Sequence, residues 1–292
     1  MTRFKGPLLL VAAMALFALL DANSKLLAGR YGADQVLVIR YGTLLALLGF
    51  LRLFWRGAGG PIQTAHTGLH LLRALCMAGS AYGFFLAFRD IPLAEGYLVY
   101  FTAPFFTLLL ATLVLGERNG GAVWFWSAVG FLGVIVAMYP ALSSSGTSAE
   151  FPWHAYAWAF LGTMTYAGFL TLSRMLRAEQ NAARLIFWSS GPLFLAILPF
   201  AVAEWVTPNA LDWVALIANG LFAGGATLAL AIAFSIDRAA RLAPLEFTAL
   251  VFALFLDAAI WQLWPGGWTL AGATIVVFAC LMSERAARAD HH

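Results

Sequence analysis

The chain of 292 residues is 62% hydrophobic and only 11% charged, with a mean hydropathy of +0.83 and a formal net charge of +3. Soluble domains carry charges on about a quarter of their residues, so this composition excludes an ordinary soluble domain and indicates an integral membrane protein. The basic residues are spread over many loops, so we expect no nucleic-acid partner. Cys76 and Cys280 lie inside apolar segments, and no metal-ligand spacing is present.

Ten apolar segments follow one another along the chain, each near the length of about 20 residues that a membrane helix needs. We predict helices at about 6–28, 34–55, 69–88, 91–115, 121–140, 153–176, 184–206, 212–236, 242–264 and 267–284. Long unbroken apolar runs such as 98–115 argue against a transmembrane β-barrel, whose strands alternate over roughly ten residues. The expected fold is therefore an all-α integral membrane protein with short loops.

The first segment follows two basic residues and resembles a signal peptide, but Asp21 and Lys25 interrupt its end, so we interpret it as a retained helix. Basic residues gather at both chain ends and in the loops that follow even-numbered segments: Arg3, Lys5, Arg52, Arg56, Arg118, Arg177, Arg184, Arg238, Arg241, Arg285 and Arg288. The positive-inside rule then predicts that both termini are cytoplasmic, in a bacterial inner membrane.

The two halves of the chain repeat each other. Phe101-Thr102-Ala103 returns as Phe247-Thr248-Ala249, and Gly120-Gly121 returns as Gly266-Gly267 at the same offset. Each half holds five segments, and an odd number means that the second copy enters the membrane from the opposite side. We expect a first repeat at 1–140, a linker at 141–152, a second inverted repeat at 153–285 and a cytoplasmic tail at 286–292.

Residues 87–138 carry a recognisable pattern: a small-residue helix, a helix with Pro104, the turn Gly116-Glu117-Arg118, and a helix with Gly130 and Gly133. This pattern resembles the EamA-type repeat of the drug/metabolite transporter superfamily, whose plan is ten helices in two five-helix repeats. In the second half the equivalents are degenerate, with Gln262 in place of the turn glycine. The resemblance implies a transporter of small metabolites, and in size and layout the chain is most similar to aromatic amino-acid exporters.

Small residues and prolines suggest where helices pack or bend. Gly79 and Gly83 in the third segment match Gly220 and Gly224 in the eighth, and small residues let membrane helices approach closely. Pro104 and Pro244 lie in the fourth and ninth segments, which are repeat equivalents, and are candidate hinges for alternating access.

Charged residues inside membrane segments are costly and often functional. Asp21 and Lys25 stand four residues apart on one helical face, so they can form a self-neutralising pair, and Asp21 is also a candidate for ion coupling. Arg40 can hold a substrate carboxylate, pair with Asp21 or reach interfacial lipid.

The fourth and ninth segments are the best place for a substrate site. Tyr100 and Glu246 occupy repeat-equivalent positions, so both can face one cavity, where Glu246 can bind a proton or an ammonium group. Pairing with Arg238 or Arg241 is the structural alternative for Glu246, and Asp257 is a second acidic candidate. Further candidates to line an aromatic cavity are Tyr82, Glu95, Tyr97, Tyr166 and Trp188.

No zinc, aspartyl-protease, serine-hydrolase or nucleotide-binding motif is present, so we expect neither an enzyme nor a cofactor. We predict an inner-membrane transporter that works by alternating access and exports amino acids with hydrophobic or aromatic side chains. Its partners are a small-molecule substrate and the bilayer, and it can act as a monomer. The alternatives are uptake of a larger metabolite such as a nucleoside derivative, an intramembrane enzyme, or a lipid-handling protein.

Overall fold

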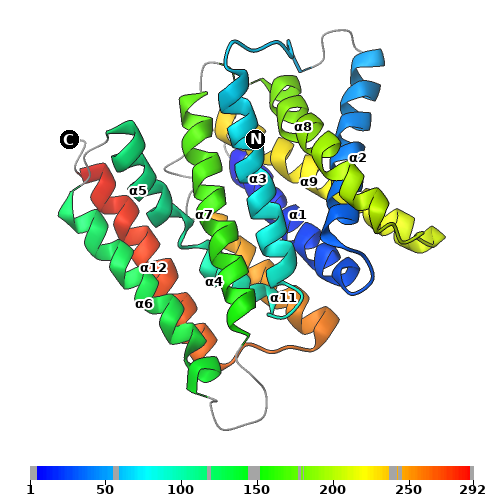
Figure 1. Cartoon of the computed structure of the whole chain (residues 1–292). Coiled ribbons are helices and arrows are strands. Elements are labelled where there is room, and N and C mark those ends of the chain that lie inside the picture. Colours follow the sequence, from blue (N-terminus) through cyan, green and yellow to red (C-terminus); the bar gives the residue numbers. More distant parts are fainter. Residues whose placement is uncertain are drawn as a thin grey trace.

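The computed structural model describes residues 5–54, 59–116, 120–143, 152–176, 179, 181–236, 242 and 245–289. Within these ranges the chain is helical and has no strand (Figure 1). The helices are α1 (Lys5–Ala28), α2 (Ala33–Phe54), α3 (Thr67–Ala87), α4 (Leu93–Tyr100), α5 (Ala103–Leu115), α6 (Gly121–Ser143), α7 (Trp153–Met175), α8 (Ala182–Ala203), α9 (Ala210–Ile236), α11 (Thr248–Trp261) and α12 (Gly267–Ala289).

Seven helical segments of the described chain are long and apolar enough to cross a membrane, and α4 and α5 together form one of them. Two further helices, α11 and α12, have shorter apolar parts. The remaining helix, α7, has 23 residues. Large apolar side chains such as Leu53, Leu113 and Leu211 point outward, where a soluble protein would carry polar residues. The expected all-α membrane fold of about ten helices is confirmed.

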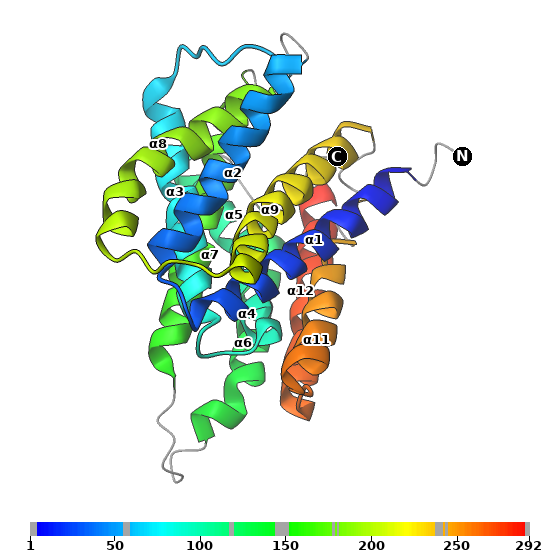
Figure 2. The same cartoon turned by 90° about the vertical axis from the view of Figure 1, so that its right-hand side faces the viewer.

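The start of α1 and the end of α12 lie toward the same end of the molecule (Figure 2). We call the face that holds the start of α1 and the end of α12 the termini face. The face that holds the α1–α2 connection, residues 29–32, is the opposite face.

We predicted one helix at about 91–115 for the fourth membrane segment. In the structure this segment is broken at Phe101 and Thr102. Pro104 has no N–H to donate and stands in the first turn of α5, where that donor is not needed. The Thr102 hydroxyl donates a hydrogen bond to the carbonyl of Val99 at 2.6 Å, and Thr248 does the same with Leu245, also at 2.6 Å. The second half has leucine, not proline, at the position equivalent to Pro104. The feature that the two halves share here is therefore the threonine, Thr102 in the first half and Thr248 in the second. Pro244 lies outside the described residues.

α5 and α11 also end alike. Gly116 and Gln262 take left-handed backbone conformations, with φ of 68° and 58°. Their N–H groups bond to the carbonyls of Ala111 and Asp257, at equivalent positions in the two halves. Glycine adopts this conformation without strain, whereas Gln262 does not.

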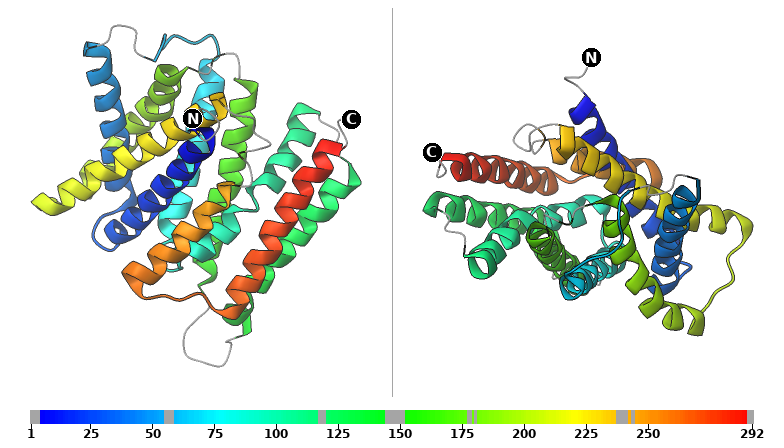
Figure 3. Two further views of the ribbon diagram at one scale, coloured as in Figure 1. Left: turned by 180° about the vertical axis from the view of Figure 1, so that it is seen from behind. Right: turned by 90° about the horizontal axis from the view of Figure 1, so that it is seen from above.

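Helix packing follows the same correspondence. By the repeat, α1 is equivalent to α7 and α3 is equivalent to α9. α3 packs along α7, and α1 packs along α9 in the same way (Figures 1 and 2). α2 packs on α8, and α6 lies beside α12 at one edge of the molecule (Figure 3). On this ground we propose that residues 1–140 and 153–285 are inverted repeats joined by 141–152.

Glycines lie at the closest of these contacts. A Cβ atom on Gly83 of α3 would lie 2.7 Å from the backbone of Gly162 and Trp158 on α7, and one on Gly79 would lie 2.8 Å from Thr165. On α9, a Cβ atom on Gly220 would lie 2.6 Å from Thr43, and one on Gly224 would lie 2.7 Å from Leu44. Larger side chains at these four glycines would push the helices apart.

Candidate functional site

Three tyrosines meet where α4 ends, and we call Tyr97, Tyr100 and Tyr166 the tyrosine cluster. The rings of Tyr97 and Tyr100 on α4 have centroids 6.0 Å apart, and the ring of Tyr166 on α7 lies 5.1 Å from that of Tyr100. Behind them, Phe101 and Phe247, equivalent residues of the two halves, contact each other at 5.0 Å. The cluster therefore lies where the two halves meet, beside both repeated threonine sites.

Glu246 lies beside this cluster. Its carboxylate interacts electrostatically with the hydroxyl groups of Tyr100 and Tyr166, so the structure brings the equivalent residues Tyr100 and Glu246 together. The alternative partners Arg238 and Arg241 lie outside the described residues. A carboxylate beside aromatic hydroxyls, inside the membrane part of a protein, can bind a proton or an ammonium group.

The expected pair of Asp21 and Lys25 does not form. Asp21 accepts a hydrogen bond from the Tyr97 hydroxyl at 2.8 Å, which links α1 to the tyrosine cluster. Lys25 donates to the carbonyl of Ile91 at 2.8 Å, and its ammonium lies 4.7 Å from the centre of the Trp261 ring. The long lysine side chain reaches toward the opposite face, where a backbone carbonyl, an aromatic ring and the nearby carboxylates of Asp257 and Glu95 stabilise its charge.

Arg40 of α2 is buried close to Asp21. Its Nε donates to Asn219 of α9 at 2.6 Å and its Nη2 donates to Ser24 of α1 at 3.0 Å. Asn219 in turn donates to Ser24 at 3.0 Å. Arg40 and Asp21 interact electrostatically, although the structure contains no direct ion pair between them.

Arg73 of α3, also in the first half of the chain, lies in the symmetry-related place between α3, α7 and α8. It donates to Ser173 of α7 at 2.8 Å and to Ser189 of α8 at 2.9 Å, and its guanidinium lies 4.5 Å from the centre of the Phe169 ring. Each of these two symmetry-related places thus holds one buried arginine between three helices, but both arginines belong to the first half of the chain, one on α2 and the other on α3. An aromatic ring, not a carboxylate, accompanies Arg73.

Asp257 has a structural role at the opposite face. Its two oxygens accept hydrogen bonds from the backbone N–H groups of Leu93 (3.1 Å) and Ala94 (2.8 Å), so it caps the start of α4. Glu95, in the same first turn, accepts a hydrogen bond from Tyr156 of α7. A cavity of about 60 Å³ touches both carboxylates. Glu95 and Asp257 therefore lie near the opposite face, at the start of α4, away from Tyr100 and Glu246.

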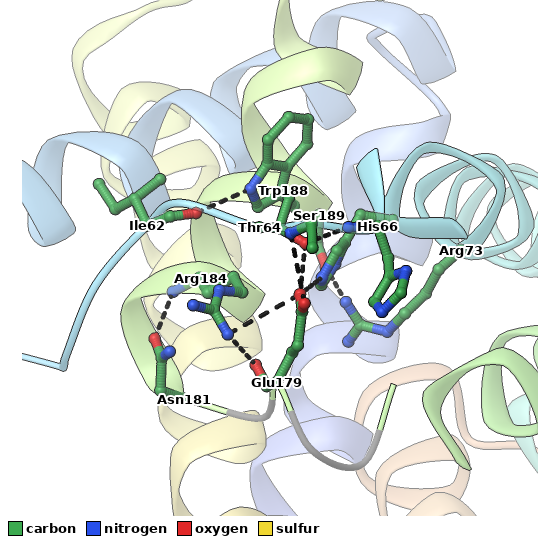
Figure 4. A network of polar contacts seen from close by, with 11 residues as sticks. Ile62, Thr64, His66, Arg73, Glu179, Asn181, Arg184, Trp188 and Ser189 are labelled. Carbon is green, nitrogen blue, oxygen red and sulfur yellow. Dashed lines mark hydrogen bonds and ion pairs between the residues drawn. The ribbon is translucent and has the colours of Figure 1, made fainter. Parts of the chain in front are cut away.

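A polar network ties α3 to α8 at the termini face (Figure 4). Glu179 accepts hydrogen bonds from the Thr64 hydroxyl and the Ala65 N–H, contacts the His70 ring at 3.2 Å, and lies 3.8 Å from the Arg184 guanidinium. The Thr64 bond is the main cause that lowers the pKa of Glu179 to about 2, with His70, Ala65 and Arg184 adding to it. We call this the Glu179 network.

Trp188 belongs to this network and not to the tyrosine cluster. Its indole N–H donates to the carbonyl of Ile62 at 3.0 Å (Figure 4). Its ring also stacks on that of His70, with the ring centroids 5.9 Å apart. Tyr82, another aromatic candidate, donates to Asp34 at the start of α2. The structure thus gathers Tyr97, Tyr100, Tyr166 and Glu246 with Asp21 and Arg40, and leaves Trp188 and Tyr82 at other contacts.

The opposite face has a matching network around Asp212, at the start of α9. Its carboxylate accepts hydrogen bonds from Arg30 (2.8 Å), Tyr31 (2.7 Å) and Asn209 (2.8 Å). The hydrogen bond to Asp212 raises the pKa of the Tyr31 hydroxyl. We call this the Asp212 network, and it ties α9 to the α1–α2 connection as the Glu179 network ties α8 and its preceding segment to α3.

Sequence reasoning assigned no role to Ser24, Glu179 or Asp212. A signal existed for the serine, because Ser24-Lys25-Leu26-Leu27 resembles Ser173-Arg174-Met175-Leu176. Both serines contact a buried arginine. Glu179 and Asp212 looked like ordinary charges at segment ends, and their partners are 115 and 182 residues away in the chain, so the local pattern carries no sign of them.

Comparisons with known proteins agree with this fold. Residues 153–284 match the model of the EamA-like transporter family. The expectation that the first half carries the stronger family pattern is wrong, because the match falls on the second half. A solved crystal structure has a TM-score of 0.67 at 18% identity, covering 99% of this chain and 100% of its own, which shows a shared fold.

Curated relatives align over nearly the whole chain. The pseudopaline exporter CntI of Pseudomonas aeruginosa is 28% identical, covering 96% of each chain. An S-adenosylmethionine uptake transporter of Rickettsia prowazekii is 25% identical over 93% of this chain and 90% of its own. A riboflavin transporter of Brucella anthropi is 24% identical over 91% and 95%. With its helical fold and these relatives, the chain is a small-metabolite transporter, not an enzyme, and its residues 153–284 match the EamA-like transporter family.

Proposed function

We propose that the chain exports amino acids with hydrophobic or aromatic side chains across the bacterial inner membrane by alternating access. The observation that carries this proposal is the tyrosine cluster with Glu246, at the meeting point of the two repeated threonine sites. Aromatic rings bind apolar or aromatic groups by stacking, and their hydroxyls bind polar ones.

The breaks beside Thr102 and Thr248 support movement at this level. A helix interrupted near the centre of the membrane can tilt its two parts separately, because no continuous ladder of backbone hydrogen bonds joins them. In this mechanism the Glu179 network holds the protein closed at the termini face, and the Asp212 network holds it closed at the opposite face. The substrate passes each face only when the network at that face is broken. Glu246 accepts a proton during the cycle.

The orientation with cytoplasmic termini is part of this proposal. Described basic residues at or near the termini face include Lys5, Arg52, Arg174, Arg184 and Arg285. The opposite face carries Lys25, Arg30 and Arg89. The positive-inside rule favours the termini face as cytoplasmic.

Uptake of a larger metabolite is the second candidate. The relatives named for S-adenosylmethionine uptake and riboflavin transport favour it, because their names cover larger molecules and one of them names the inward direction. Transport direction and substrate size separate the two candidates.

The test is efflux from proteoliposomes that contain the purified full chain and are preloaded separately with labelled Phe, Trp, Thr, uridine or riboflavin. Saturable efflux of Phe and Trp above that of empty liposomes is the expected result. Flux of uridine or riboflavin without amino-acid flux would replace the proposal with the second candidate. Repeating the assay with a pH gradient tests whether protons drive the movement.

A further inference from the structure

We propose that Asp21 and Arg40 bind the two ends of a zwitterion, an α-amino acid or a molecule that carries that group. Arg40 binds the carboxylate and Asp21 binds the ammonium, while the tyrosine cluster receives the remainder of the substrate. This inference rests on the proposed amino-acid export and adds which residues recognise the charged group.

Arg40 is a buried cation with unused hydrogen-bond donors. The residue is only 8% exposed, and its two acceptors, Asn219 and Ser24, are neutral. A guanidinium has five N–H groups, and within the described chain only two of them are bonded. Nη1 therefore has two donors free, in the fork geometry that fits a carboxylate. The nearby Tyr41 hydroxyl is also buried without a partner in the described chain.

Asp21 is the complementary anion. One oxygen accepts the Tyr97 hydroxyl, and the other accepts no hydrogen bond from the described residues. Its charge and that of Arg40 balance, yet the structure contains no direct ion pair between them. A purely structural pair gains most of its energy from direct contact, whereas these two separated charges keep hydrogen-bonding groups that a bridging ligand can use.

The two groups lie at equal depth. Arg40 is seven residues into α2 from Ala33, and Asp21 is seven residues from the end of α1 at Ala28. At 1.5 Å per residue, both lie about 10 Å below the opposite face. An α-amino acid carries its ammonium and carboxylate on one carbon, so its charged group suits two side chains that interact electrostatically without a direct ion pair.

The neighbouring rings define the other end of the ligand. Tyr97 bonds to Asp21 and continues through Tyr100 to Tyr166, with centroid spacings of 6.0 and 5.1 Å. A charged site and an aromatic wall are thus contiguous. The corresponding arginine, Arg73, lacks both features, because its neighbours are two serines and a phenylalanine ring.

The first test uses the wild-type full chain in nanodiscs with labelled phenylalanine as the probe. Unlabelled phenylalanine, phenylethylamine (no carboxylate) and 3-phenylpropionate (no ammonium) compete for the site. We expect each one-charge analogue to bind about 10- to 100-fold more weakly than phenylalanine, because each lacks a charge-assisted hydrogen bond. Equal competition by all three would overturn the inference and leave amino-acid export standing.

The second test separates the two charges. Arg40→Gln should weaken phenylalanine and 3-phenylpropionate about 10-fold or more, while phenylethylamine keeps its wild-type affinity. Asp21→Asn should give the reverse pattern. Arg89→Gln, in an exposed loop at the same face, is the matched control and should leave all three affinities unchanged.

Opposite selectivities cannot result from general misfolding, so they support the inference directly. A parallel loss of all three ligands in both variants, with unchanged thermal unfolding, would contradict it, and so would unchanged affinities. If wild-type protein neither binds phenylalanine nor moves it in proteoliposomes, the proposed function and this inference both fail. That result differs from every outcome above.

Discussion

Replacing Gly83 with alanine should loosen the contact between α3 and α7. The added Cβ atom would lie 2.7 Å from backbone atoms of Gly162 and Trp158, which cannot rotate away as a side chain can. Ordinary carbon contacts begin near 3.5 Å, so the helices must separate by about 1 Å. Such overpacking costs about 1–3 kcal/mol, and the better helix propensity of alanine returns about 0.5–1 kcal/mol. The expected net loss is about 1–2 kcal/mol.

Gly49→Ala is the matched control, because the same substitution on α2 meets nothing within 4 Å. It should raise stability slightly or leave it unchanged. Thermal unfolding of the purified protein measures both variants. Alkylation of Cys76 gives a local readout, because its sulfur lies 3.1 Å from the position of a Cβ atom on Gly168 of α7. A Gly83→Ala protein as stable as Gly49→Ala, with unchanged Cys76 alkylation, would refute the packing argument.

Four further changes test other parts of the structure. Gln262→Gly should raise the unfolding midpoint by the equivalent of about 1 kcal/mol, since it relieves a left-handed conformation; a lower midpoint would show that the glutamine side chain matters more than the backbone. Gly224→Leu should destabilise the protein through its contact with Leu44, and a normal midpoint would contradict that. Glu246→Gln should lower transport without changing the midpoint, and unaltered flux at every pH would remove Glu246 from the site. The pKa of Glu179 falls from 4.5 to about 2 in the fold, so its contribution to stability is present above pH 4.5 and is lost as pH falls toward 2. Acidification across that window should lower the midpoint of wild-type protein more than that of Glu179→Gln, and equal shifts would count against the network.

The fold was predictable because lipid imposes long apolar helices, and hydropathy reports them directly. A candidate hinge was predicted at Pro104, but the break at Phe101 and Thr102 was not, because an apolar run looks the same whether or not its backbone hydrogen bonds are continuous. The sequence feature that marks the break is the repeated Phe-Thr-Ala. We used that repeat as evidence for duplication and not for a local conformation.

The site was predictable where symmetry applied and not where contacts were remote. Tyr100 and Glu246 were linked because equivalent residues of inverted repeats meet near the axis. Lys25 was assigned to Asp21 because helical spacing shows only neighbours on the same helix, and its true contact, Ile91, is 66 residues away. Asp257 resembled a coupling acid, since sequence alone cannot show that the start of α4 lies against its carboxylate.

The most direct measurement is an experimental structure of the protein with bound phenylalanine. We predict that the carboxylate lies within hydrogen-bonding distance of Arg40 Nη1, the ammonium contacts Asp21, and the ring rests against Tyr97, Tyr100 and Tyr166. Phenylalanine bound elsewhere, for example at the Glu95 and Asp257 cavity, would contradict the account of this transporter's central site.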